Sequence, residues 1–201
     1  MRFPFLSILL PLAWVLTVLP PASAGEAPTV RVAHLQGTTT LPQHPQRVVI
    51  LNPSTLDIAD ALGITPAGVP QAGFTYPAHL AKYNGQGYFN AGTLFEPAYE
   101  ALSAAAPEAI FAGGRALAAY NKLSGIAPTV SLDIDPHDFM QSLTQRTTQL
   151  GEIFGKQAQA TAVLTAFNAQ IADLRPLAAR SGSAMMLMVN GGKLSAYTPH
   201  S

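Results

Sequence analysis

The sequence contains no cysteine, and this absence excludes several kinds of site at once. Disulfide bonds cannot form, and neither a thiol enzyme nor a metal site with cysteine ligands is possible. The cysteine that carries the lipid of a bacterial lipoprotein is missing as well. Any binding site must therefore be built from other side chains and from backbone groups.

Charged residues are scarce, and the two signs are balanced. Lys and Arg together number 11, as do Asp and Glu, so the formal net charge is zero. Nucleic acids and anionic membranes select proteins with basic patches, so neither is expected as the main partner. A small molecule or a soluble protein partner fits this composition better.

Catalytic and cofactor-binding signatures are also missing. Gly113-Gly114 lacks the spacing of a phosphate loop or dinucleotide fingerprint, and the sequence has no Gly-x-Ser-x-Gly motif. We therefore expect neither an enzyme nor a built-in cofactor. The histidines lack metal-ligand spacing, so no protein-ligated metal is expected, although two of them could still meet in space. They are His34, His44, His79, His137 and His200.

Residues 1–24 have the features of a secretory signal peptide. A basic start is followed by the apolar stretch Phe3–Val18 and by Ala22-Ser23-Ala24, which has the pattern of a cleavage site. A transmembrane anchor is the alternative, but Pro4 and Pro11 disfavour it. The rest of the sequence has no apolar run of the ~18 residues that a membrane span needs. If the source is bacterial, we expect a free periplasmic protein.

A strand followed directly by a helix is predicted within residues 47–63. The nearly all-apolar Arg47–Leu51 is typical of a parallel strand that is buried on both faces. Ser54 and Asp57 predict an S-x-x-D capping pair for a helix that ends at Gly63. The N–H groups at the helix start make Asn52 and Ser54 candidates for a weak anion site. An ordinary capped helix without a ligand is the alternative.

Five aromatic residues lie in the long irregular stretch Pro70–Asn90. They could form a stacking wall for an aromatic or macrocyclic ligand, which makes Tyr76 and Tyr88 candidate ligand-binding residues. They could equally hold the loop against the body of the domain. The five are Phe74, Tyr76, Tyr83, Tyr88 and Phe89.

The central passage Gly92–Val130 predicts a helix, a strand and a second helix. Glu96-Pro97 is expected to open the first helix, because proline is tolerated in a first turn. The apolar Ala109–Ala112 predicts a buried strand that ends at Gly113-Gly114. Arg115 follows at the carboxyl end of this strand, which is the edge where open α/β sheets bind ligands.

The last predicted elements are a long helix and the first strands of a second lobe. Lys156–Ala179 has a single apolar stripe and predicts a helix of roughly 20 residues, long enough at ~30 Å to cross between lobes. Ala184–Asn190 predicts a buried strand, and Leu194–Tyr197 predicts its partner. We expect this second lobe to be cut off, so that the chain is a fragment. Other predicted elements are strands at Thr29–Leu35, Gly37–Leu41, Ala67–Val69 and Pro128–Asp133, and a helix at Phe139–Phe154 capped by Asp135 or Asp138.

The order of these motifs resembles the periplasmic substrate-binding proteins of iron–siderophore ABC transporters, in which a rigid helix joins two α/β lobes. The branch that receives catecholate siderophores is the most similar. Cobalamin, haem and hydroxamate receptors share the fold. The segments that carry the resemblance are Val30–Ile64, Ala91–Val130, Leu150–Ala160 and Asn190–Tyr197.

The resemblance implies a fold and a division into parts. A Rossmann-like, three-layer N-terminal lobe with a parallel sheet is expected, followed by a long bridging helix and only the start of a second α/β lobe. The expected parts are a signal peptide at 1–24, the ligand-binding lobe at 25–155, the bridging helix at 156–180 and the first strands of the second lobe at 181–201.

The resemblance also implies partners and residue roles. Arg115 is expected to contact an anionic ferric siderophore, in which the iron is bound through the siderophore. Glu100, with Glu96 one turn earlier, is expected to dock on the inner-membrane permease from the end of the strand opposite to Arg115. Dipole complementation at a helix start is the alternative for both acids. The expected protein is a monomeric receptor; the alternatives are a cobalamin or haem receptor and an exported sensor or interaction protein.

Overall fold

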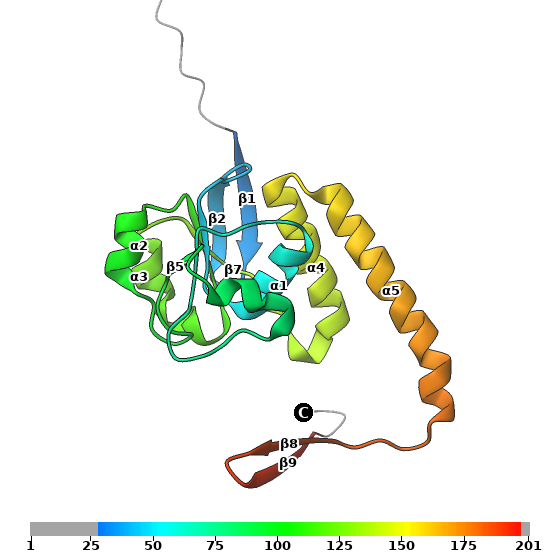
Figure 1. Ribbon diagram of the computed structural model, residues 1–201. Helices are drawn as coiled ribbons and strands as arrows, with labels where there is room; N and C mark the ends of the chain where they lie inside the picture. Colours follow the sequence, from blue (N-terminus) through cyan, green and yellow to red (C-terminus); the bar gives the residue numbers. More distant parts are fainter. Residues whose placement is uncertain (1–27, 198–201) are drawn as a thin grey trace, which may run out of the picture.

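The computed structural model describes residues 28–197. A five-stranded sheet with helices on both faces is preceded by one β-hairpin and followed by a long helix and a second hairpin (Figure 1). The predicted signal peptide at residues 1–24 and the segment 198–201 lie outside the described residues. The predicted α/β fold class is confirmed.

The central sheet has the strand order β5-β4-β3-β6-β7, and every neighbouring pair is parallel. Val48 and Ile50 belong to one core cluster and Val49 to the other, as the alternation of side chains along a strand requires. All of β3 is buried, which confirms the prediction for this strand. The strands are β3 (Val48–Ile50), β4 (Gly68–Val69), β5 (Phe89–Asn90), β6 (Ala109–Ala112) and β7 (Thr129–Ser131).

Helices cover both faces of the sheet and give the lobe three layers. On one face, Leu56 of α1 and Leu150 of α4 pack in the same core cluster as Phe111. On the other face, Leu102 of α2 and Leu123 of α3 pack in the second cluster. The helices are α1 (Pro53–Ala61), α2 (Tyr99–Ala105), α3 (Tyr120–Ser124) and α4 (Phe139–Phe154). Short 3₁₀ helices form parts of the connections: η1 (Ala78–Asn84), η2 (Gly114–Ala119) and η3 (Pro136–Asp138).

The first hairpin pairs β1 (Thr29–His34) with β2 (Gly37–Pro42), as the two predicted strands with a turn between them suggested. It is not part of the central sheet. The Thr39 hydroxyl donates to the Thr129 carbonyl at 2.9 Å, so the hairpin is attached beside β7.

The predicted start of the helix at Glu96-Pro97 is wrong. Thr93 Oγ1 accepts hydrogen bonds from the backbone N–H groups of Phe95 and Glu96, and Pro97 forms an antiparallel bridge with Gly92. These contacts close a turn, and α2 begins only at Tyr99. The second predicted helix of this passage is divided into η2 and α3.

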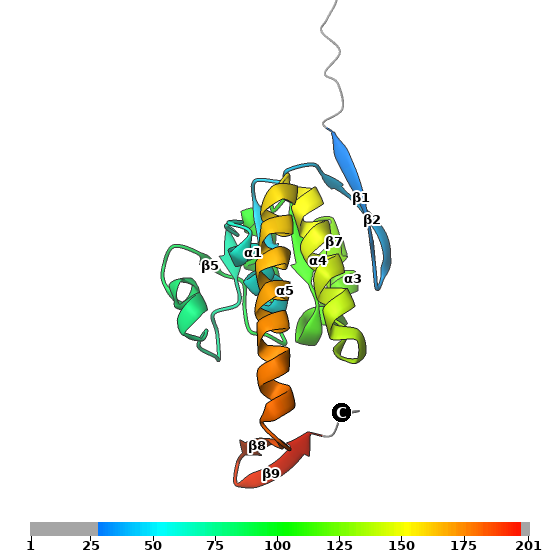
Figure 2. The same ribbon diagram turned by 90° about the vertical axis from the view of Figure 1, so that its right-hand side faces the viewer.

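The long helix α5 (Gln157–Arg180) follows α4 after a single turn. Figure 2 shows it running along the outside of the lobe beside α4. The first half of its apolar stripe packs against the lobe: Ala160 is buried, and Val163 contacts the core cluster. In the second half, Leu174 and Leu177 are exposed. Within residues 28–197, no helix combines the length and hydropathy of a membrane span.

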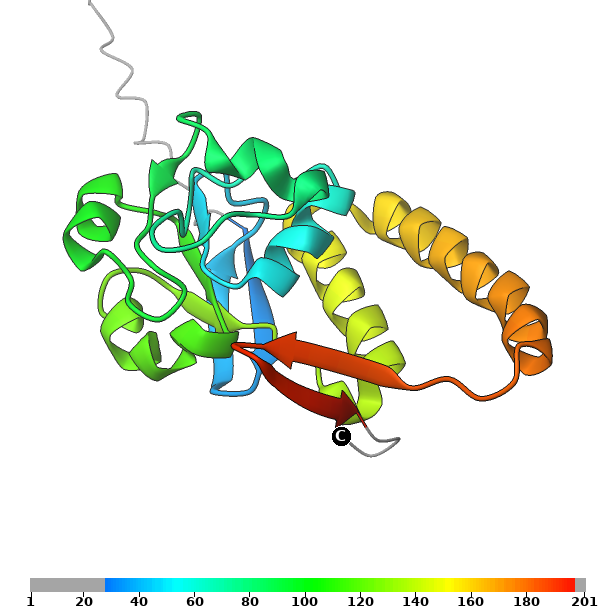
Figure 3. The ribbon, with the colours of Figure 1, turned by 60° about the horizontal axis from the view of Figure 1, so that its bottom comes forward.

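The second hairpin pairs β8 (Met186–Asn190) with β9 (Lys193–Tyr197), as predicted. Every residue of both strands is exposed, so the expectation of a buried strand here is not met. Figures 1 and 3 show that α5 carries the chain past the lobe to the end where α4 begins, with the hairpin beyond that end.

Candidate functional site

The carboxyl ends of β3, β6 and β7 lie at one edge of the sheet, because these three strands are neighbours and parallel. Two adjoining hollows, of about 590 Å³ and about 330 Å³, lie at this edge and share Asn52, Ser54 and Gly114. We call them together the strand-end groove. Its other lining residues include Leu94 and Arg115 at one end and Asp133, Asp135, Asp138, Ser142 and Arg146 at the other.

Asn52 follows Leu51, the first residue after β3, and it is the N-cap of α1. Its Oδ1 atom accepts the Ser54 N–H at 3.0 Å, and Pro53 occupies the first turn. The predicted capping pair of Ser54 and Asp57 is therefore wrong. An asparagine before a proline at the end of an apolar run was the sequence signal for the true cap. Asn52 is only 5% exposed and lines the groove, as does the exposed Ser54 in the first turn of α1.

Arg115 is presented by the glycine pair that ends β6. Gly113 and Gly114 have φ angles of 153° and 54°, so the chain turns sharply into η2 in a conformation that favours glycine. The exposed Arg115 side chain lines the groove together with Asn52 and Ser54. The structure thus brings together three of the residues that the sequence singled out.

Phe95 is a residue of this site that the sequence analysis missed. Its ring centroid is 5.0 Å from Cζ of Arg115, and its side chain is 67% exposed. A guanidinium over an aromatic face is a favourable arrangement. The turn around Thr93 presents Phe95, but Arg115 is distant in sequence, so no local pattern could have indicated the contact.

Glu96 and Glu100 lie at the same end of the sheet as Arg115, which corrects the expectation of opposite ends. β5 is parallel to the other strands, and α2 follows its carboxyl end, so the start of α2 lies at the edge of the sheet that carries the strand-end groove. Glu96 adjoins Phe95, the aromatic neighbour of Arg115. Both acids are exposed, and Glu100 lies in the first turn of α2, where a negative charge complements the helix dipole.

The structure does not bring Tyr76 and Tyr88 to the groove. Tyr76 is 4% exposed and Tyr83 is 1% exposed, and both belong to the core cluster below the loop. Tyr88 is half-buried against the same cluster, with its ring 4.8 Å from that of Tyr83. Of the two alternatives for the aromatic loop, the structure therefore favours attachment to the domain over a ligand wall.

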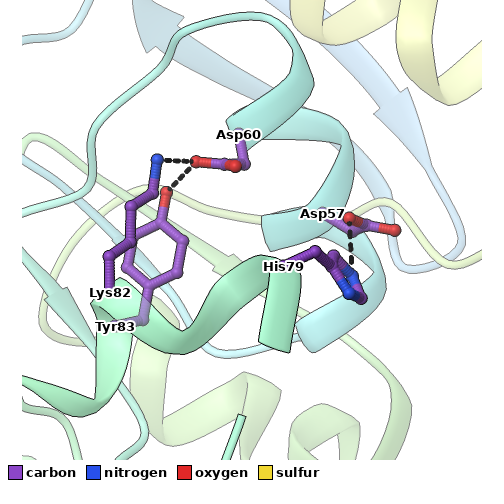
Figure 4. Close-up of polar contacts among 5 residues, drawn as sticks. All are labelled: Asp57, Asp60, His79, Lys82 and Tyr83. Atoms are coloured by element: carbon purple, nitrogen blue, oxygen red, sulfur yellow. Dashed lines mark hydrogen bonds and ion pairs between the residues drawn. The ribbon is translucent and has the colours of Figure 1, made fainter. Parts of the chain in front are cut away.

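Two carboxylates on one face of α1 face η1, and the contacts of Asp60 attach it to the helix (Figure 4). Asp60 accepts a 2.6 Å hydrogen bond from the Tyr83 hydroxyl and pairs with Lys82, and Asp57 lies 3.3 Å from His79. Burial opposes ionisation of Asp60, but the hydrogen bonds from Lys82 and Tyr83 outweigh it and lower the pKa of this carboxyl. Burial is the main cause that raises the pKa of Tyr83, and the hydrogen bond to Asp60 raises it further.

The far end of the groove is organised by Arg146, which the sequence analysis did not single out. This arginine is buried, and its Nε atom donates to the Asp133 carbonyl at 3.0 Å while Nη1 donates to Gln149 at 2.8 Å. Asp135 caps η3 by accepting the His137 N–H at 2.9 Å. Among residues 28–197, no group of three or more His, Asp or Glu side chains is placed to hold a metal ion.

Comparisons with known proteins agree on one family. Residues 48–200 match the family described as periplasmic binding protein. The petrobactin-binding protein YclQ of Bacillus subtilis is 31% identical over 166 residues, covering 81% of this chain and 52% of the relative. The ferric-anguibactin-binding protein FatB of Vibrio anguillarum is 31% identical over 178 residues, covering 86% and 54%. The chain thus spans about half the length of these curated relatives.

Solved structures show the same likeness in three dimensions. The structure of the YclQ protein has a TM-score of 0.82 at 30% identity, covering 87% of this chain and 62% of that chain. The periplasmic catecholate-siderophore binding protein VctP of Vibrio cholerae has a TM-score of 0.77 at 34% identity, covering 87% and 63%. Family match, sequence relatives and fold agree: the chain belongs to the periplasmic binding protein family.

Proposed function

We propose that this chain belongs to the solute-binding protein of an ABC importer, which captures a ferric siderophore in the periplasm and delivers it to the inner-membrane permease. The ligand class is an anionic complex, of the catecholate type. The observation that carries the proposal is Arg115 beside Phe95 at the mouth of the strand-end groove. The names of the relatives support the same class, since two are called petrobactin- and ferric-anguibactin-binding.

The chemistry of the ligand matches this pair of side chains. A ferric tris-catecholate is negatively charged, and its outer surface is formed by aromatic rings. A guanidinium is charged at every physiological pH, donates hydrogen bonds to oxygens in a planar fork and stacks on rings. Phe95 adds an exposed aromatic face at 5.0 Å from that charge. Asn52 and Ser54 supply polar groups at the floor of the same groove.

The parts of the chain receive roles within this proposal. Residues 25–155 form the ligand-binding lobe, 156–180 the bridging helix and 181–201 the first strands of a second lobe. The fully exposed strands β8 and β9 and the greater length of the relatives support this division. A monomer is proposed, with the signal peptide at 1–24 directing export.

Glu100 and Glu96 are proposed to dock on the permease. Both are exposed at the groove end of the sheet, so a permease that contacts them would lie next to the bound ligand. Exposed charges at the rim of an interface act mainly on orientation and association rate. We expect Glu100→Lys to slow ligand-dependent stimulation of the permease's ATPase and to leave ligand affinity unchanged.

The ligand class is tested by equilibrium ultrafiltration with coloured complexes. The protein is mixed with ferric 2,3-dihydroxybenzoate, a ferric trihydroxamate and ferric citrate, and the retained absorbance is measured. Preferential retention of the catecholate is the expected result. Cobalamin and haem serve as arms for the alternative receptors, and retention of one of these instead would replace the proposal. No retention of any ferric complex would contradict it.

A further inference from the structure

Asp133 lies just beyond the end of β7 and accepts hydrogen bonds from residues that follow β3 and β6. It follows β7 and Leu132, and its Oδ1 atom accepts hydrogen bonds from Asn52 Nδ2 at 2.6 Å and from the Gly114 N–H at 2.7 Å. Asn52 ends the β3 segment and Gly114 ends the β6 segment. One carboxylate oxygen thus joins the two segments that present the groove's candidate ligand contacts.

The contact is close enough to require glycine. A Cβ atom on Gly113 would collide with Asp133 Oδ1 and would lie 2.7 Å from Asn52 Nδ2. The backbone of the glycine pair therefore packs directly on the Asn52–Asp133 hydrogen bond, at φ angles that favour glycine. The hydrogen bond from the Gly114 N–H to the carboxylate adds a fixed contact to this flexible pair.

The same bond determines which way the Asn52 amide faces. Oδ1 of Asn52 is used by the Ser54 N–H and Nδ2 by Asp133, so the orientation follows from both partners. One N–H of Nδ2 donates to Asp133, and the other can donate to an acceptor in the groove that Asn52 lines. Asn52 therefore offers a donor, which suits an oxygen-rich ligand.

We propose that Asp133 is the positioning residue of the ligand site: it orients the Asn52 amide and the Gly113-Gly114 turn, and through that turn it places Arg115. The proposal rests on the proposed function for the identity of the ligand. Asp133 lines the groove, and its role in this proposal is to accept the hydrogen bonds of Asn52 and Gly114. Its effect on binding passes through Asn52 and Arg115.

The acceptor role gives a clear pair of variants. In Asp133→Asn, an amide oxygen at the place of Oδ1 can still accept both N–H groups, whereas Asp133→Ala removes both bonds. We expect Asp133→Ala to weaken binding of ferric 2,3-dihydroxybenzoate about tenfold, and Asp133→Asn to stay within about threefold of the natural chain. Asp173→Ala removes an exposed aspartate of α5 and is the matched control, which should leave binding of ferric 2,3-dihydroxybenzoate unchanged.

A second readout needs no ligand. Hydrogen exchange by NMR is measured at the Gly114 amide and the Asn52 side-chain amide, which should exchange faster in Asp133→Ala and unchanged in Asp133→Asn. Unchanged exchange in Asp133→Ala would overturn the proposal, as would equal losses of binding in the two variants. If Asp133→Ala does not fold, altered exchange in Asp133→Asn overturns it. If the natural chain binds no ferric complex, the proposed function fails, while exchange still decides the role of Asp133.

Discussion

At the scale of single residues, the site depends on side chains that serve the fold and the groove together. Asn52 caps α1 through Oδ1 and joins Asp133 through Nδ2. Arg115 lies at the groove because Gly113 and Gly114 turn the chain, and Phe95 lies beside it because Thr93 closes a turn. None of the contacts between these residues is local in sequence, apart from the cap and the turn themselves.

Removing the cap should therefore destabilise the lobe. We expect Asn52→Ala to lower the free energy of unfolding by at least about 1 kcal/mol, since an N-cap is lost and Asp133 loses a donor. Urea unfolding followed by circular dichroism measures the difference. Asn121→Ala, at an exposed position of α3, is the control. An equal effect of the two substitutions would show that the Asn52 contacts contribute nothing.

Phe95 should contribute to affinity and only slightly to stability. Its side chain is 67% exposed, and its contact is with Arg115. We expect Phe95→Leu to weaken binding of ferric 2,3-dihydroxybenzoate about two- to fivefold, since the variant loses both the ring that holds the Arg115 guanidinium and an aromatic face for the ligand. Phe139→Leu, at another exposed phenylalanine outside the strand-end groove, should leave affinity unchanged. Equal losses in both variants would count against a role for the Phe95 ring.

At the scale of elements, η1 and the aromatic loop are held by α1. The Asp60 carboxylate binds Tyr83 and Lys82, and the pKa of Asp60 is lowered in the folded state. A lowered carboxyl pKa means that this stabilisation is complete above the ordinary value of about 4 and is lost as the pH falls through the folded-state pKa. The attachment of the loop should therefore weaken in acid.

The variant Asp60→Asn tests this pH dependence. At pH 7 we expect its Tm to lie a few degrees below that of the natural chain, and the two values should converge as the pH falls below about 4. Asp57→Asn is the control, because its pair with His79 is exposed on both sides and contributes little. A Tm difference that stays constant down to acid pH would contradict the account of Asp60.

Elements were predicted from sequence where their cause is local. The apolar runs of β3 and β6, with glycine or proline beside them, define strands that need both faces covered, and the stops of α1 and α4 were marked by Gly63 and Gly155. The start of α2 was misplaced, because a side chain of the turn decides it. The burial of Tyr76 was undecided, because it depends on packing against distant elements.

At the scale of the whole molecule, one compact lobe carries the groove and one helix leads away from it. The half of α5 near α4 is packed, and its later apolar residues are exposed, as are all residues of β8 and β9. The order of these parts could be predicted because a long amphipathic helix between two α/β patterns is unusual. The position of Glu96 and Glu100 beside the groove could not, since it follows from the parallel pairing of β5.

In the proposed function, Arg115 recognises the negative charge of a ferric catecholate at the strand-end groove. The most direct measurement compares the natural chain with Arg115→Ala for two probes, the anionic ferric 2,3-dihydroxybenzoate and a neutral ferric trihydroxamate. Arg31→Ala, at an exposed arginine of β1, controls for net charge. We expect Arg115→Ala to weaken the anionic probe about tenfold or more and the neutral probe far less. Equal losses for both probes would contradict a direct charge contact.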